Sequence, residues 1–165
     1  MLASIAGAAG TIDERDAQIT RSGMYAEYPA IFGSYLELAR DSQDQATALE
    51  ALKRAVFLAW RSFSALPVET GLAELPETEV RELMEVLETA IKTGAVDEEL
   101  RLMLAWYRDV FGYVFDHFGP VRSLDPFIME VSATDVRGRG PLVIRRADRG
   151  QLGLYWTGVL TESGA

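Results

Sequence analysis

Residues 97–118 read DEELRLMLAWYRDVFGYVFDHF, and this stretch decides the fold. Its apolar residues recur at steps of three and four, which is the period of an α-helix with one apolar face. The members of this stripe are Leu100, Met103, Leu104, Tyr107, Phe111, Val114, Phe115 and Phe118. Trp106, Val110 and Tyr113 widen the stripe, so we expect a central helix that is contacted on several sides.

Three more helices are predicted upstream of it. The first covers 24–41, with Pro29 as an alternative first residue, and its aromatic stripe suits core packing better than an exposed interface. This stripe consists of Tyr25, Tyr28, Phe32 and Tyr35. The second runs from about 47 to 65 after a capping-box pattern of Ser42 with Gln45. The third follows Pro76 and ends at Gly94.

These four principal helices form two pairs, which predicts two antiparallel helical hairpins in a bundle or a HEAT-like arrangement. The triplet Leu-Ala-Trp occurs at 58–60 and again at 104–106, a spacing of 46 residues that falls within the range of HEAT-type repeats. The two copies share only these three residues, so a coincidence between two amphipathic helices explains the repeated triplet better than a true structural repeat.

The sequence changes character after Pro120. Residues 142–146 and 152–160 fit strands, and Asp148-Arg149-Gly150 between them fits a turn. Residues 127–132 fit either a strand or a short helix. The prediction is therefore a mainly α protein with a small C-terminal β-hairpin or three-stranded antiparallel sheet. We expect one domain over 1–165, with a loose segment at 1–22, a helical core at 24–119 and a β-containing segment at 121–162.

Composition excludes several classes of site. The chain has 25 acidic and 16 basic residues, one histidine, no cysteine and a net charge of −9. Thiol catalysis, thiolate zinc sites and iron–sulfur clusters need cysteine, and multi-histidine metal sites within one chain need more than His117. An all-carboxylate magnesium or calcium site stays open, and no cofactor is predicted. Fourteen of the basic residues are arginine, which fits either a GC-rich genome or thermal adaptation.

The start of the chain bears on location. Residues 1–10 are small and apolar but lack the basic residues of a secretory signal, and no run approaches the roughly 20 apolar residues that span a bilayer. The sequence therefore predicts a cytoplasmic protein without a membrane span. Its oligomeric state stays open.

Basic residues gather near the C-terminus. Residues 135–165 carry a net charge of +2, whereas residues 1–134 carry −11. The arginine cluster, as we name it, consists of Arg137, Arg139, Arg145, Arg146 and Arg149. One hypothesis is an anion or phosphate site, because guanidinium groups and backbone amides bind phosphate. The favoured interpretation is that these arginines pair with the acidic helices or protect an edge strand.

Acidic residues follow one another along the third predicted helix. This glutamate row consists of Glu79, Glu82, Glu85 and Glu88. It fits a solvated face better than a metal or paired-carboxylate site, and such a face attracts a basic partner protein. His117 is a candidate general base, but a helix-end histidine packed on aromatic residues is favoured because no partner motif accompanies it.

Common catalytic motifs are absent. The sequence holds no G-x-G-x-x-G, G-x-x-x-x-G-K-[ST], G-x-S-x-G or H-E-x-x-H, and no catalytic residue is predicted. The leading hypothesis is a non-enzymatic interaction module, such as a regulator, adaptor or immunity-like inhibitor, that uses an acidic helical surface. The alternatives are a domain that binds small anionic ligands through the arginine cluster, and a carboxylate-based or metal-assisted enzyme. The net negative charge disfavours nucleic acid as a partner.

Overall fold

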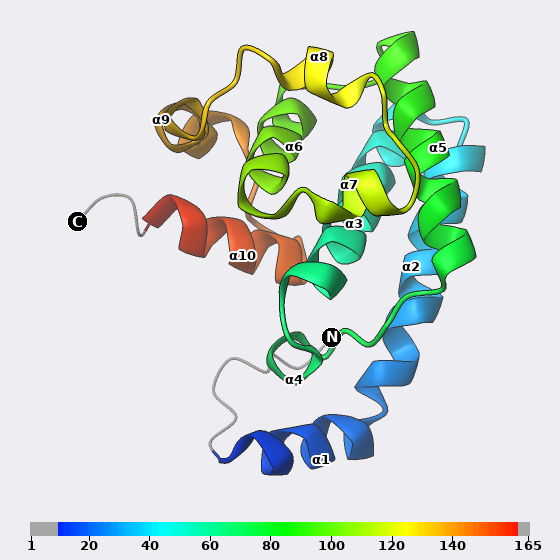
Figure 1. Ribbon diagram of the computed structural model, residues 1–165, viewed down its shortest axis with the longest axis vertical. Helices are drawn as coiled ribbons and strands as arrows, with labels where there is room; N and C mark the ends of the chain where they lie inside the picture. Colours follow the sequence, from blue (N-terminus) through cyan, green and yellow to red (C-terminus); the bar gives the residue numbers. More distant parts are fainter. Residues whose placement is uncertain (1–9, 162–165) are drawn as a thin grey trace. The chain divides into compact units, whose positions relative to one another are not determined.

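The structure, a computed structural model, describes residues 10–161. This part of the chain consists of helices joined by turns and loops, and it contains no strand (Figure 1). The packing divides the chain into two units, Met1–Leu83 and Met84–Ala165. The expectation of a single domain stays a prediction. None of the helices in the described range is both long enough and apolar enough to cross a membrane.

The first unit is built on the packing of α2 (Met24–Asp41) against α3 (Gln45–Ser64). The three residues between them turn the chain back, so the first predicted helical pair is confirmed. Tyr28 and Phe32 of the aromatic stripe are buried, while Tyr25 and Tyr35 are half-buried at its borders. This stripe is therefore largely core, as its spacing predicts.

The ends of these two helices differ from the expectation. α2 begins at Met24 and contains Pro29, so the alternative start at Pro29 is wrong. A proline at this depth removes one main-chain hydrogen bond, and the helix continues through it. α3 begins after Asp44, whose carboxylate accepts a hydrogen bond from the Thr47 amide at 3.0 Å. The cap is this aspartate instead of Ser42.

Two smaller helices complete the first unit. α1 (Ile12–Ser22) lies in the segment expected to be loose, and α4 (Pro67–Thr70) lies between the second and third predicted helices. A reciprocal capping box of Thr11 with Glu14 begins α1. α1 packs against α2 and α4. Residues 1–9 of the expected tail lie outside the described residues.

α5 (Glu77–Thr93) matches its prediction at both ends. Pro76 precedes it, and Gly94 follows it with a φ of 73°, a left-handed conformation that glycine adopts without a steric penalty. The division between the units falls within this helix. Val80 and Leu83 are fully buried in the first unit, and Leu87 is fully buried in the second.

The central helix of the second unit is shorter than its stripe predicts. α6 (Glu98–Phe111) begins after Asp97, whose carboxylate accepts from the Leu100 amide, and Gly112 then separates it from α7 (Tyr113–His117). The Arg108 side chain passes over Gly112, where an added Cβ atom would lie 2.9 Å from the Arg108 carbonyl. α6 packs mainly on α9 and α8, so it is the contacted central element that its wide stripe indicates.

The predicted C-terminal β-hairpin or three-stranded sheet is wrong. Three helices occupy this segment: α8 (Leu124–Ile128), α9 (Ala133–Val143) and α10 (Gly150–Thr161). The two-residue alternation requires Leu152, Leu154 and Trp156 to share one face, but Leu154 is 60% exposed. Leu152 and Trp156 are buried at a spacing of four, which is the helical period. The turn predicted at Asp148-Arg149-Gly150 is only partly present: residues 147–148 form a turn between α9 and α10, and Gly150 is already the first residue of α10.

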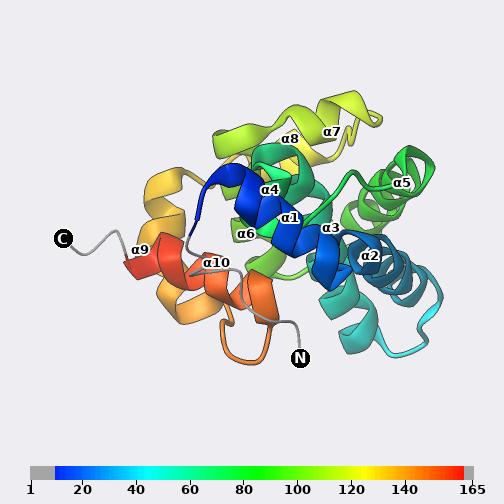
Figure 2. The same ribbon diagram turned by 90° about the horizontal axis from the view of Figure 1, so that it is seen from below.

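Glycine and proline residues explain why the sequence pattern does not predict helices in this segment. α9 contains Gly138, Gly140 and Pro141, residues that disfavour helices in isolation. α9 and α10 pack against each other (Figures 1 and 2), and two glycines of these helices have close neighbours. A Cβ atom at Gly140 would lie 2.8 Å from Leu160 of α10, and one at Gly153 would lie 2.0 Å from the Arg146 carbonyl oxygen. Tertiary contact therefore outweighs helix propensity in this segment.

A pair of substitutions in α10 tests this close approach. We expect Gly153→Ala to destabilise the protein by about 1–3 kcal/mol or more, because the Arg146 backbone must move to admit a methyl group. Gly158→Ala, in the same helix with open space around it, should stabilise by roughly 0.5–1 kcal/mol. Urea unfolding measures both. Equal effects of the two substitutions would contradict the packing.

Alkaline pH probes the first unit. Burial, then the negative charge of Glu27, raises the pKa of Tyr28 to about 12 from 10. Between these values the unfolded chain loses the phenol proton while the folded chain keeps it. This contribution, about 2–3 kcal/mol, is therefore present below pH 10 and lost as the pH rises through 12. Between pH 8 and 11.5, the free energy of unfolding measured in urea should fall less for Tyr28→Phe than for the parent protein. Identical pH slopes would refute the assignment.

Candidate functional site

The first turn of α6 holds a buried ion pair. Nη1 of Arg149 donates to Oε1 of Glu99 at 2.5 Å, and Nη2 lies 3.1 Å from Oε2. The two side chains are only 1% and 5% exposed. The backbone amide of Arg145 also donates to Glu99, at 2.6 Å, and Arg149 donates to the Arg145 carbonyl. One carboxylate thus anchors the loop that joins α9 to α10.

The structure does not bring the arginine cluster together on one open anion site. Arg149 is buried in its ion pair, and Arg139 pairs with Glu98 at 2.5 Å. The guanidinium of Arg137 lies 5.7 Å from the centre of the Trp106 ring. The remaining members, Arg145 and Arg146, are exposed and half-buried respectively. Both carboxylates belong to α6, so pairing with an acidic helix describes part of the cluster.

Aromatic side chains join α10 to α6. Nε1 of Trp156 donates to the Tyr107 hydroxyl at 3.1 Å, and Nε1 of Trp106 donates to the Tyr155 hydroxyl at 2.7 Å. Burial raises the pKa of Tyr107 well above 10 and outweighs the Trp156 hydrogen bond, which lowers it. Tyr107 therefore stays a neutral phenol and serves as a packing and hydrogen-bonding residue.

The glutamate row is largely engaged by the protein itself. Glu82 forms an ion pair with Arg40 of α2. Glu88 pairs with Lys92 at 2.8 Å and accepts from the Ser123 amide, and these contacts lower the pKa of Glu88. One oxygen of Glu79 is buried without a hydrogen bond to any described residue, and Glu85 is exposed. Only Glu85 therefore presents its whole carboxylate to a partner without first leaving such a contact.

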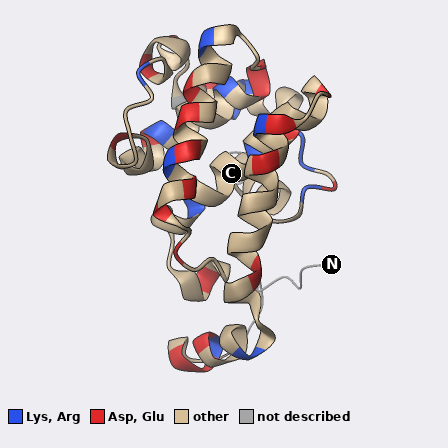
Figure 3. Ribbon diagram, turned by 90° about the vertical axis from the view of Figure 1, so that its right-hand side faces the viewer, with Lys and Arg blue, Asp and Glu red and all other residues tan. Residues whose placement is uncertain are grey.

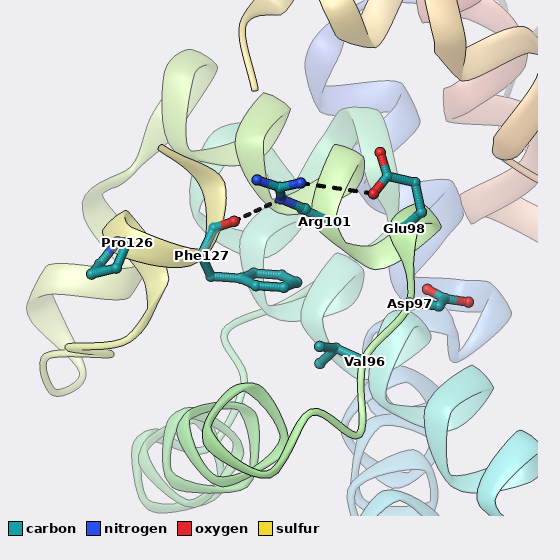
Figure 4. A pocket seen from close by; sticks show the side chains of 6 residues that line it. All are labelled: Val96, Asp97, Glu98, Arg101, Pro126 and Phe127. Atoms are coloured by element: carbon teal, nitrogen blue, oxygen red, sulfur yellow. Dashed lines mark hydrogen bonds and ion pairs between the residues drawn. The ribbon is translucent and has the colours of Figure 1, made fainter. Parts of the chain in front are cut away.

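Sequence reasoning missed a pocket of about 410 Å³ beside the start of α6 (Figure 4). Its lining residues are Val96, Asp97, Glu98, Arg101, Pro126 and Phe127. Arg101 donates from Nε to the Phe127 carbonyl at 2.7 Å, and its guanidinium carbon lies 5.8 Å from the centre of the Phe127 ring. Glu98 and Glu130 stand 4.0 and 3.9 Å from its Nη atoms. With Asp97 close by, this pocket favours cations over anions.

A second cavity, of about 340 Å³, lies between α2 and α3. Arg54 lines this cavity and, like Arg101 in the first pocket, lies near both a ring and a carboxylate. Its guanidinium carbon is 5.6 Å from the centre of the Tyr35 ring, and its Nε donates to Glu50 at 2.8 Å. The Tyr35 hydroxyl accepts from Nη1 at 3.2 Å. An arginine held between an aromatic ring and a carboxylate is thus a recurring arrangement in this protein.

The bend between α6 and α7 exposes aromatic side chains that the sequence assigned to a buried stripe or its flank. We call Val110, Phe111, Tyr113 and His117 the aromatic corner; its first three members are 49%, 36% and 47% exposed. The Tyr113 and His117 rings stack with centres 4.7 Å apart, and Phe111 lies 6.0 Å from Tyr113. The signal was Gly112, which interrupts a stripe too wide for one helix to bury.

His117 lies exposed in this corner, with its ring against Tyr113 on one side and the edge of Phe118 on another. This placement matches the favoured interpretation of a helix-end histidine packed on aromatic residues. Among residues 10–161, no three histidine, aspartate or glutamate side chains gather in a way that would hold a metal ion.

Comparison with protein-family models, with curated proteins and with solved structures finds no match to this chain. Functional inference therefore rests on the residues themselves.

Removing one partner of the buried ion pair should cost far more than removing an exposed one. We expect Glu99→Ala to destabilise by about 3–5 kcal/mol, because Arg149 would remain charged and buried. Glu98→Ala, at the neighbouring position, should cost about 1 kcal/mol or less because its pair with Arg139 is exposed. Denaturant unfolding distinguishes them. A double variant, Glu99→Leu with Arg149→Met, should recover most of the loss; failure to recover would show that the charges are not the cause.

Proposed function

We propose that this protein is a non-enzymatic interaction module that binds a partner protein presenting a basic surface. The observation that carries this proposal is an imbalance in how the charges are used. Many arginines bind the chain's own carboxylates, whereas the side-chain carboxylates of a set of exposed acids have no ion pair or hydrogen bond to any described residue. This set comprises Asp13, Glu27, Glu37, Glu69, Glu74, Glu85 and Asp109.

The uncompensated acids occur in both units and on several helices. Figure 3 shows acidic positions spread along most of the ribbon, with basic positions interspersed among them. With a net charge of −9, the protein carries a long-range negative potential that accelerates encounter with a basic partner and opposes association with other acidic proteins. This potential falls off within about 10 Å at 0.1 M salt, so binding should weaken as salt increases.

The other charged groups already have structural tasks. The buried pair of Glu99 with Arg149 closes a loop, and Asp44 and Asp97 cap helices. Glu82 and Glu88 of the glutamate row bind residues outside their own helix. The proposal therefore assigns recognition to the acids that fold stability does not use, and among the glutamate row it retains Glu85.

The test is partner capture with a neutralised variant. Immobilised parent protein should retain a stoichiometric basic partner from lysate of the source organism at low salt, identified by mass spectrometry. A variant with Glu27, Glu37, Glu69 and Glu85 changed to Gln should bind the purified partner at least about fourfold more weakly, given roughly 0.2–1 kcal/mol for each exposed charge. A matched control changes four exposed neutral residues to Ser: Gln18, Gln43, Thr78 and Thr157.

Equal melting temperatures establish that all three proteins fold alike. Salt-sensitive binding that survives in the control and falls in the neutralised variant supports the proposal. If no partner is retained, or if all three proteins bind it equally well, the proposal is wrong.

A further inference from the structure

The aromatic corner combines exposed aromatic surface with negative charge, and the residue that organises it is Arg108. Nη1 of Arg108 donates to Asp116 at 2.7 Å and to the Gly112 carbonyl at 3.3 Å, while Nε lies 3.2 Å from Asp125. One guanidinium therefore binds groups of α7, of α8 and of Gly112, which joins α6 to α7. Its two aspartates remain 66% and 68% exposed.

The charges at this bend do not balance. Asp116 and Asp125 share a single arginine, and Asp109 is exposed without an ion pair or hydrogen bond to a described residue. With Arg108 as the one cation of this group, three carboxylates leave a formal charge of −2 beside the aromatic surface. An apolar partner surface alone would leave these carboxylates poorly solvated, whereas a cationic one would satisfy them.

Two arginines of this protein, Arg54 and Arg101, each lie against an aromatic ring with a carboxylate beside it. Arg54 lies over Tyr35 with Glu50 beside it, and Arg101 lies over Phe127 with Glu98 at 4.0 Å. Guanidinium suits such a site because its flat face stacks on a ring while its edge donates to carboxylates. At the corner, the exposed rings of Phe111 and Tyr113 lie within four positions of Asp109 and within five of Asp116 along α6 and α7, and Arg108 binds Asp116 and Asp125.

We propose that the aromatic corner is the docking surface for an arginine-bearing amphipathic segment of a partner protein. Arginine side chains of that segment lie against Phe111 and Tyr113 and donate to Asp109 and Asp116, while its apolar residues cover Val110. The corner is held in place before binding, because Arg108 and Gly112 fix the bend, so little ordering cost accompanies docking. This assignment rests on the proposed function and names its partner chemistry and its surface.

A defined peptide tests the assignment without knowledge of the natural partner. The probe is an acetylated and amidated alanine-rich helical peptide with three arginines and two leucines on one face, and its control replaces each arginine with uncharged citrulline. Calorimetry gives the affinity, and backbone amide NMR shifts of the full chain locate the site. We expect shifts confined to α6, α7 and α8 and no binding of the citrulline peptide.

Three variants separate the corner from general surface charge. Asp109→Asn and Tyr113→Leu should each weaken peptide binding about three- to tenfold, which is the range of one charge or one cation–π contact. Tyr113→Leu keeps apolar volume and removes the ring. Glu37→Gln, which neutralises an exposed acid outside α6, α7 and α8, should change the affinity less than about twofold if the peptide binds at the corner. Melting temperatures show that each variant folds.

Several outcomes would show that the aromatic corner is not the docking surface. No binding at millimolar peptide, equal affinity of the corner variants and the parent, shifts elsewhere, or self-association through the corner in sedimentation each overturns the docking assignment. The proposed function is judged separately on the captured partner. If that partner loses affinity for the four-glutamine variant but not for Asp109→Asn and Tyr113→Leu, the protein is an interaction module that uses another surface.

Discussion

A buried ion pair organises the second unit. Glu99 sits in the first turn of α6, and its carboxylate binds both the guanidinium of Arg149 and the amide of Arg145. Because neither charge reaches water, each requires the other, and the chain must return to the start of α6 when this unit folds. α10 begins directly after Arg149, so the same pair sets where Trp156 meets Tyr107. Nonspecific apolar collapse would not fix that register, since many relative positions of two apolar helices bury similar areas.

The sequence is informative where one helix carries its own signals. α5 has a proline before it, a glycine after it and a regular apolar face, and the structure agrees at both ends. It fails where a distant contact decides. Alternation over 152–160 fits a strand and, equally, one buried face of a helix, and only the packing of Trp156 against α6 chooses between them. Gly140 and Gly153 disfavour a helix in isolation, yet a Cβ atom at Gly153 would meet the Arg146 backbone and one at Gly140 would meet the Leu160 side chain.

The candidate sites show the same limit. The arginine cluster is visible as a composition shift, but the carboxylates that bind Arg139 and Arg149 lie 41 and 50 residues earlier in the chain. Spacing along the sequence carries no trace of those pairs. The aromatic corner is predictable from the sequence, because a glycine inside a wide apolar stripe indicates a bend. A bend leaves part of the stripe exposed to water. The regular apolar period over 97–118 predicts one continuous helix instead, with Phe111 in the apolar stripe, Val110 and Tyr113 on its flank and His117 at the helix end.

Arginine rather than lysine makes this arrangement possible. A guanidinium has five donors in one plane, so a single side chain can bind a carbonyl, two carboxylates and a ring at once, as Arg101 does. Arg108 binds a carbonyl and two carboxylates. Each such arginine satisfies several internal groups, and fewer cations are then needed to fold the chain than it has acids. The excess acids need no internal partner and remain at the surface, where they cost little because water solvates them. The excess acids make the exterior strongly negative, and where that exterior meets exposed rings at the α6–α7 bend, the complementary group that we propose is an arginine of the partner.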